Sequence, residues 1–270
     1  MSRTAVYTGL VLRSRQSGES NTEITLLTAE DGIIRATVFG GPKSKLRAHS
    51  APYNSGRVWI YRDKAKDYAH NNSYAKLSDF DVQCWRAGLR ELYERTMTAS
   101  AVAQTILTSH GGGGDWGTAF RLAVSTLDAL ENANDELCPR ILIHFLWRWA
   151  GFLGIQPNIH NCTECGKIMD DNLLLFDIKE GSSVCAGCSL RISHSASNQE
   201  FDHAPNRIKD SALLLQLNPG SRRWLSAVEK LEPSLINRYS MDNSSFSDAK
   251  ALVTSIMAEA LGKRLNSWDW

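Results

Sequence analysis

The sequence predicts an α+β protein, with an N-terminal five-stranded β-barrel followed by an α-helical domain that contains an inserted four-cysteine segment. Three observations support this prediction. Over roughly the first 80 residues, short runs alternate between apolar and polar residues, which is the period of half-buried strands. From Trp85 onward, apolar residues recur at helical spacing. Two C-x-x-C pairs follow, a pattern typical of a zinc site.

Five strand-like runs are separated by turn-forming residues such as Gly18 and Glu30-Asp31-Gly32. The predicted strands are Thr4–Leu12, Glu23–Thr28, Ile33–Phe39, Arg57–Tyr61 and Tyr68–Leu77. Five short strands, with a short non-strand segment between the third and the fourth, are typical of an OB-fold. We therefore expect residues 1–82 to form an OB-fold domain that binds nucleic acid.

Helical spacing dominates the remaining chain. A first helix is expected from Trp85, Asp115 is expected to cap a second, and Pro139 suits the first turn of a third. Helical spacing returns in Arg207–Leu217, Ser221–Leu231 and Asp248–Asn266. We expect one α-helical domain over residues 83–270, with a zinc-binding insertion at about 158–192.

Four cysteines carry the most specific chemical signal in the chain. Cys162, Cys165, Cys185 and Cys188 have the spacing C-x2-C-x19-C-x2-C. Two thiolates three residues apart can bind one metal ion in a tight turn, and two such turns complete a tetrahedron. We expect one structural Zn²⁺ per chain. The alternative is two redox or free-thiol pairs, although no thioredoxin-like βαβ pattern surrounds either pair.

Positive charge is concentrated early in the chain, although the net charge is only +1. Proteins that hold single-stranded nucleic acid combine cations for phosphates with aromatic residues for bases. The residues expected to contact nucleic acid are Arg35, Lys43, Lys45, Arg47, Arg57, Trp59, Tyr61, Arg62, Lys64 and Lys66. The alternative is a solvated charged surface, with the aromatic residues packed against the helical domain.

Several function classes are not expected. The sequence has no P-loop, no H-x-E motif paired with the cysteines and no G-x-S-x-G, so we do not expect an enzyme. The most apolar run, Ile141–Ile155, is interrupted by His144 and Arg148 and is shorter than the ~20 residues of a membrane span. No secretory signal opens the sequence, so we expect a cytoplasmic protein without a membrane partner.

Three segments together resemble the RecO family. Gly9-Leu10-Val11-Leu12-Arg13, followed by Leu26-Leu27-Thr28, is similar to the family's opening strands. Gly40-Gly41-Pro42-Lys43-Ser44 lies where the family tends to have a Lys-Gly-x-Arg-(x)-Lys-Ser run. Residues 151–157, Gly-Phe-Leu-Gly-Ile-Gln-Pro, followed by the four cysteines, resemble the family's zinc segment. The chain departs from the family at Phe39, where a lysine is common, and at Gly41-Pro42.

The resemblance implies a bacterial, nucleoid-associated mediator of DNA repair and homologous recombination. Such proteins bind single- and double-stranded DNA, anneal complementary strands, engage the C-terminal tail of SSB, and with RecR help to load RecA on SSB-coated DNA. Arg121, Arg140 and Arg148 are candidates for the cation beside an SSB-tail groove, or ordinary helix-surface charges. The alternatives are an OB-fold/zinc-ribbon RNA-binding or transcription-associated factor, and a protein-interaction scaffold.

Overall fold

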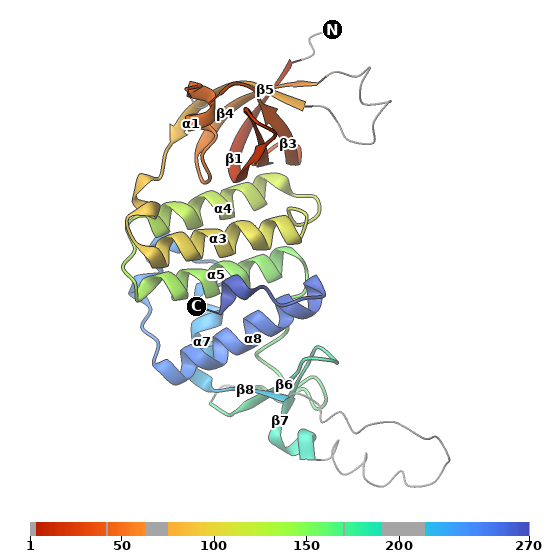
Figure 1. Cartoon of the computed structure of the whole chain (residues 1–270). Coiled ribbons are helices and arrows are strands. Elements are labelled where there is room, and N and C mark those ends of the chain that lie inside the picture. Colours follow the sequence, from red (N-terminus) through yellow and green to blue (C-terminus); the bar gives the residue numbers. More distant parts are fainter. Residues whose placement is uncertain (1–3, 42, 63–74, 170, 191–213, 270) are drawn as a thin grey trace, which may run out of the picture. The chain divides into compact units, whose positions relative to one another are not determined.

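The computed structural model describes residues 4–41, 43–62, 75–169, 171–190 and 214–269 (Figure 1). The chain packs into two compact units, which are treated separately below. The first comprises residues 1–145 with 265–270, and the second comprises residues 146–264. The expected boundary after residue 82 falls within the last strand of the barrel, Ala75–Cys84, and as a domain boundary it stays a prediction.

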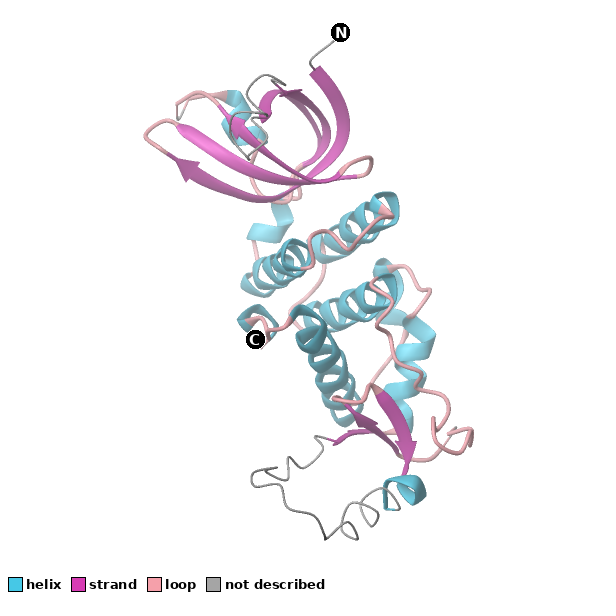
Figure 2. Cartoon of the chain, turned by 90° about the vertical axis from the view of Figure 1, so that its right-hand side faces the viewer, coloured by secondary structure: helices cyan, strands magenta, loops and turns pink. Residues whose placement is uncertain are grey.

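Five strands of the first unit form a closed barrel in the order β1-β2-β3-β5-β4 (Figure 2). Neighbouring strands run antiparallel except for β3 and β5, which are parallel. A short helix, α1 (Lys45–His49), lies between the third and fourth strands. The strands are β1 (Thr4–Ser17), β2 (Asn21–Thr28), β3 (Gly32–Val38), β4 (Ser55–Arg62) and β5 (Ala75–Cys84). This architecture confirms the predicted OB-fold.

The barrel interior is built by the alternation that the sequence displays. Every second residue of a strand points inward, and the inward residues form one apolar cluster. The cluster comprises Val11, Ile24, Leu26, Ala36, Val38, Val58, Ile60, Ala75, Leu77 and Phe80. Gly56 allows β4 and β5 to approach closely, because a Cβ atom at this position would lie 2.1 Å from the Asp81 carbonyl oxygen.

The fifth strand continues further along the chain than predicted. It spans Ala75–Cys84, whereas the prediction was Tyr68–Leu77; residues 68–74 lie outside the described residues. The outward positions of β5 hold Ser78, Asp79 and Asp81, residue types that are depleted in strands. A register shift opposite Trp59/Ile60 also interrupts the alternation, which explains why the pattern was hard to recognise.

Helices of the first unit pack beside the barrel. They are η1 (Ala87–Arg90), α3 (Tyr93–Thr108), α4 (Trp116–Glu131) and the first part of α5 (Leu137–Phe152). Asp115 caps α4 as predicted, accepting a hydrogen bond from the Thr118 backbone N–H at 3.0 Å. The first helix does not begin at Trp85, because the next residue, Arg86, has a left-handed backbone conformation that no helix can continue.

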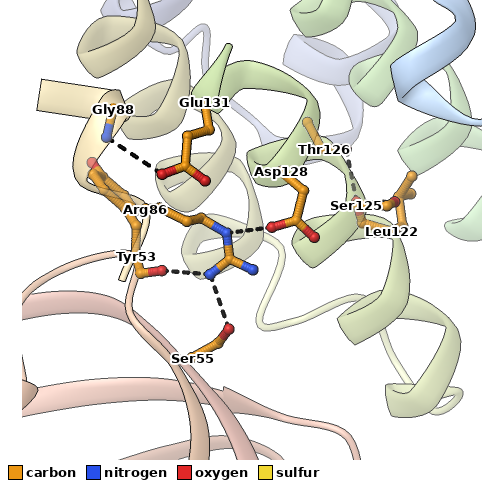
Figure 3. A network of polar contacts seen from close by, with 9 residues as sticks. All are labelled: Tyr53, Ser55, Arg86, Gly88, Leu122, Ser125, Thr126, Asp128 and Glu131. Atoms are coloured by element: carbon orange, nitrogen blue, oxygen red, sulfur yellow. Dashed lines mark hydrogen bonds and ion pairs between the residues drawn. The ribbon is translucent and has the colours of Figure 1, made fainter. Parts of the chain in front are cut away.

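Arg86 joins the barrel to α4 (Figure 3). Its side chain is fully buried, and its Nε donates to Asp128 Oδ1 of α4 at 2.7 Å. Its Nη1 donates to the carbonyl oxygen of Tyr53 at 2.7 Å and to Ser55 Oγ, at the start of β4, at 2.9 Å. The left-handed backbone conformation at Arg86 turns the chain so that its guanidinium reaches both the barrel and helix α4.

Residues after the second unit return to the first. The short helix η3 (Asn266–Trp268) places Trp268 against α3 with no exposed surface. Its indole Nε1 donates to Thr105 Oγ1 at 3.0 Å. An indole N–H inside a protein needs such a partner, because leaving it unpaired costs free energy. The first unit therefore contains residues that precede the second unit in the chain and residues that follow it.

The second unit combines helices with a small sheet ordered β7-β6-β8. Its elements are β6 (Leu174–Asp177), β7 (Ser182–Cys185), β8 (Leu214–Leu217), α7 (Pro219–Val228), η2 (Pro233–Arg238) and α8 (Asn243–Leu261). The helix predicted for Arg207–Leu217 is wrong at residues 214–217, which pair with β6; residues 207–213 lie outside the described residues. Pairing with an existing strand outweighs the local helical pattern here.

Two side-chain caps meet at the starts of α7 and α8. Asn218 accepts from the Ser221 N–H at 2.8 Å, and Asp242 accepts from the Ser245 N–H at 2.9 Å. The Ser245 hydroxyl lies within hydrogen-bonding distance of both caps, at 3.0 Å from Asn218 Oδ1 and 2.7 Å from Asp242 Oδ2. Among the described residues, no helix has the length and apolar character needed to cross a membrane.

Candidate metal centre and nucleic-acid interface

The four cysteines of the second unit converge as the spacing predicted. The Sγ atoms of Cys162, Cys165, Cys185 and Cys188 all lie within 4.8 Å of one another. Cys165 Sγ and Cys185 Sγ are 3.9 Å apart. A tetrahedral zinc ion with Zn–S bonds of ~2.3 Å requires sulfur atoms about 3.8 Å apart. The cluster therefore has the donor set and dimensions of a four-thiolate metal site.

Local hydrogen bonds form the two cysteine turns. The first turn closes where Gly166 N–H donates to the Cys162 carbonyl at 2.9 Å, with Gly166 at a φ of +70°. The second begins at Cys185, the last residue of β7, and helical residues 186–190 carry Cys188. Thr163 connects the turns, since its backbone N–H donates to the Ser183 carbonyl at 2.8 Å.

Backbone dipoles favour the thiolate form that a metal requires. Burial alone would raise the pKa of the Cys162 thiol. The backbone N–H groups of Cys185, Cys165 and Glu164 outweigh burial and lower that pKa to about 6. The pKa of Cys185 is lowered mainly by the backbone N–H of Cys188. Cys138, buried away from the cluster, shows the opposite behaviour, because burial raises its pKa to about 11.

An arginine from α7 supports the cysteine segment. Arg222 is buried, and its Nη2 donates to the Asn172 carbonyl at 2.6 Å while its Nη1 donates to the Ile159 carbonyl at 3.4 Å. These acceptors lie on both sides of the first cysteine pair. Sequence reasoning did not identify this role, because nothing in the local pattern distinguishes Arg222 from Arg223.

The predicted nucleic-acid residues lie mostly on the barrel exterior and beside α1. Arg35 on β3 and Arg57 on β4 are exposed, as are Lys43 and Lys45, whereas Arg47 is half-buried. Lys64 and Lys66 lie outside the described residues. The structure thus places exposed cations on β3, on β4 and around α1.

Arg57, Trp59 and Tyr61 occupy the outward positions of β4, between the inward residues Val58 and Ile60. Their neighbours on β5 differ. Arg57 pairs with Asp81, Trp59 with Asp79, and Tyr61 with Lys76. The two aspartates were absent from the sequence argument, which considered only residues 35–66. The two aspartates partly neutralise Arg57 and place negative charge beside Trp59. Tyr61, in contrast, lies beside the cation Lys76.

Arg62 already has partners within the barrel. Its Nη2 lies 3.1 Å from Asp31 Oδ2, and its guanidinium carbon lies 5.8 Å from the ring centre of Tyr7. Contact of Arg62 with a phosphate would compete with Asp31. Sequence reasoning also missed Lys76, which is exposed on β5, and Arg13, which is exposed on β1. Lys76 lies within the predicted fifth strand, Tyr68–Leu77, but the sequence argument assigned it no contact because it considered charges only up to Lys66.

Comparisons with known proteins agree with this architecture. Residues 1–73 match the family model described as "Recombination protein O N terminal", and residues 90–207 match "Recombination protein O C terminal". The chain belongs to the RecO family. The barrel is therefore the OB-fold domain of that family.

Curated relatives named "DNA repair protein RecO" align with much of the chain. The Anaeromyxobacter dehalogenans protein is 26% identical over 263 residues, covering 97% of this chain and 93% of the relative. The Bacillus subtilis protein is 23% identical over 267 residues, covering 96% and 90%. The Desulfitobacterium hafniense protein is 27% identical over 194 residues, which covers 69% of this chain and only 65% of the relative.

Proposed function

We propose that this RecO-family protein is a recombination mediator that binds single- and double-stranded DNA and anneals complementary strands. With RecR it helps RecA to load on SSB-coated single-stranded DNA. The observation that carries the proposal is the exposed group of cations Arg35, Lys43, Lys45 and Arg57 on the OB-fold of a RecO-family chain. The proposed action is binding, with no covalent step.

Charge neutralisation is the proposed physical basis of annealing. Two complementary strands repel each other through their phosphates, and lysine and arginine that bind phosphates displace condensed counterions. A surface that binds both strands lowers the repulsion between them. Arg47 and Arg57, and the aromatic residues Trp59 and Tyr61, remain proposed contacts, as do Arg62, Lys64 and Lys66.

The acidic C-terminal tail of SSB is a proposed partner of the helices. A cation beside an apolar surface would suit such a tail. Arg121 on α4 is exposed, whereas Arg140 and Arg148 on α5 are half-buried. Arg148 also donates to the Leu231 carbonyl at 3.2 Å, and Arg121 to Thr118 Oγ1 at 2.8 Å. Of these three candidates, Arg121 is the most accessible to a tail.

For the cysteine cluster, we propose one structural Zn²⁺. Thiolate donors favour zinc, Fe–S clusters or Cu(I), and two C-x-x-C turns with all four ligands supplied are typical of structural zinc. A bound zinc ion would fasten the two turns together and leave no open coordination position. Metal analysis of the purified chain is expected to give one zinc per chain.

The proposed mediator activity is tested with complementary oligonucleotides coated with SSB from the same organism. Fluorescence is expected to report faster annealing when the protein is added. The acceleration should disappear with SSB that lacks its C-terminal tail. An absence of acceleration by a folded, metal-loaded protein would contradict the proposal and favour the RNA-binding or scaffold alternative.

A second test addresses the phosphate contacts. Replacing Lys43, Lys45 and Arg47 together with alanine is expected to weaken DNA binding and flatten its salt dependence, because each lost phosphate contact reduces the slope by about 0.9 for duplex DNA. The alanine variant of Lys263, an exposed cation just after α8 and outside the barrel, serves as the control. An unchanged slope in the triple variant would remove the α1 cluster from the DNA contact.

A further inference from the structure

Phe39, Lys76 and Tyr61 meet on the outer wall of the barrel where β3, β5 and β4 adjoin. Thr37, two residues before Phe39, pairs with Lys76 across the parallel β3–β5 contact, and Lys76 pairs with Tyr61 across β5–β4. Ala75 and Leu77, which flank Lys76, and Ile60, which precedes Tyr61, are buried. Strand alternation therefore directs Lys76 and Tyr61 outward. Phe39 directly follows the last residue of β3 and lies beside Lys76.

The lysine lies between two aromatic residues. Lys76 Nζ is 5.4 Å from the ring centre of Phe39, which is cation–π distance. Tyr61 is the direct cross-strand neighbour of Lys76, and such neighbours have Cβ atoms ~4.5–5.5 Å apart. Lys76 is exposed, and both aromatic residues are half-buried. Each ring is thus fixed against the barrel while keeping part of its surface accessible.

Among the described residues, the charge in the row of Lys76 and Tyr61 is more favourable to phosphate than that beside Trp59. The acidic residue nearest in the same row is Glu23, which pairs with Thr37 on the adjacent strand. Its Oε1 lies 2.8 Å from the Arg15 guanidinium, so its charge is already compensated. Trp59, in contrast, lies between Val6 and the exposed Asp79.

We propose that Phe39, Lys76 and Tyr61 form a base-stacking site for single-stranded nucleic acid, in which the two rings stack on unpaired bases and Lys76 contacts the adjoining phosphate. Sequence reasoning assigned no contact to Lys76 or Phe39. The inference rests on the proposed DNA-binding function and specifies which form of nucleic acid this wall recognises.

Stacking requires an exposed base face, which a duplex does not offer. In double-stranded DNA both faces of each base are covered by its neighbours, so an aromatic side chain gains nothing without unstacking them. Phosphates, in contrast, are available in both forms. The two rings therefore discriminate in favour of single strands, whereas Lys76 contributes to both.

The test compares Phe39→Leu and Tyr61→Leu with the wild-type protein. Leucine keeps the apolar packing of a half-buried position and removes the ring. Tyr93→Leu is the matched control, because Tyr93 is an exposed aromatic residue at the start of α3, outside the barrel. Fluorescence anisotropy measures the affinity for three ligands of equal length: an oligo-dT strand, an abasic strand with the same phosphates, and a duplex. Thermal melting verifies that each variant is folded.

Loss of one stacked base corresponds to ~1–3 kcal/mol, or about 5- to 150-fold in affinity. We expect Phe39→Leu and Tyr61→Leu to weaken oligo-dT binding by at least about fivefold and to change abasic-strand and duplex binding by less than about twofold. Lys76→Ala should reduce the salt slope on oligo-dT by about 0.7, as expected for one phosphate on a single strand. The control should bind all ligands like the wild type.

Two results would overturn the inference while leaving DNA binding intact. One is an equal loss on the dT and abasic strands, which would mean that the rings do not contact bases. The other is an unchanged affinity in both ring variants together with a loss in Trp59→Leu, which would place stacking on the β4 row instead. A wild-type protein that binds none of the ligands would contradict the proposed function itself.

Discussion

The barrel and the cysteine segment hold themselves together in different ways. The barrel interior is a cluster of ten buried apolar residues that belong to all five strands. The corresponding cluster in the cysteine segment contains only Cys162, Val184 and Cys188 as buried members, and two of these are proposed metal ligands. Burial at roughly 25 cal/mol per Å² can stabilise the barrel interior, whereas the cluster around the cysteines is small, although Leu174 and Phe176 in the neighbouring strand are also buried.

The difference predicts which kind of change destabilises each region. A barrel held by many apolar contacts loses stability gradually as individual contacts are removed. A small segment held by four ligands to one ion loses its organising centre with any one of them. Metal removal should therefore act on the second unit, and core mutations should act on the barrel regardless of metal.

The largest effect is expected from Cys162→Ser. Structural zinc contributes ~10–16 kcal/mol of apparent binding free energy, and this variant lacks one of the four proposed thiolate ligands that supply it. Bound zinc should fall from one per chain to near zero, and hydrogen exchange should accelerate in residues 159–169, 171–190 and 214–217. Cys84→Ser, at an exposed cysteine outside the cluster, is the control. A Cys162→Ser protein with full zinc and wild-type melting would disprove the ligand assignment.

A smaller but metal-independent effect is expected from Leu26→Ala in the barrel. Leu26 has no exposed surface, and a leucine-to-alanine change at such a site costs ~2–5 kcal/mol. Hydrogen exchange of the barrel strands should report this loss. A chelator should not enlarge it. If chelation did increase the loss in the barrel, the two regions would be energetically coupled and the contrast between them would fail.

Asp128→Ala tests the joint between the barrel and α4. The variant leaves the buried Arg86 guanidinium without its carboxylate, and hydrogen bonds to charged groups contribute ~1.5–3 kcal/mol. Because the Asp128 side chain is 51% exposed, we expect a loss near the lower limit, about 1–2 kcal/mol. Glu136→Ala, an exposed acidic residue just before α5, should be neutral in the same denaturation assay. An equal loss in both variants would indicate a general charge effect.

The smallest effects are expected from the helix caps of the second unit, and they differ in pH dependence. Hydrogen bonds from Ser245 lower the pKa of Asp242 below its ordinary 3.8. The stabilisation is therefore present above pH 3.8 and is lost as the pH falls through the lower pKa of the folded state. The melting-temperature deficit of Asp242→Ala should shrink between pH 7 and pH 3. Asn218→Ala, costing about 1 kcal/mol, should show no such change because an amide does not titrate.

The sequence predicted those parts of the fold that depend on local pattern. Alternation identified the first four strands, and Asp115 was recognised as a cap because it precedes an apolar helical repeat. Cysteine spacing predicted the cluster, since a tight turn fixes the geometry of each pair. The cysteine site was therefore the best-predicted functional feature of the chain.

The errors arose where distant residues determine the outcome. The end of strand β5 was predicted too early because its outward aspartates resemble a loop, and their proximity to Arg57 and Trp59 depends on barrel closure. Strand β8 exists because β6 is available to pair with it, which its own sequence does not indicate. The roles of Arg86 and Arg222 depend on carbonyl and carboxylate acceptors that are far away in the chain.

The position of Trp268 has a consequence for biosynthesis. Residues 265–269 belong to the first unit but follow the whole of the second in chain order. A nascent chain can therefore close its barrel early, yet the part of α3 that Trp268 covers stays exposed, with the Thr105 hydroxyl lacking its indole partner, until the second unit has been translated. The second unit is translated before the first unit can complete its folding. A chain released before residue 265 would therefore expose the apolar surface of α3 that Trp268 covers, and chaperones or proteases could bind there.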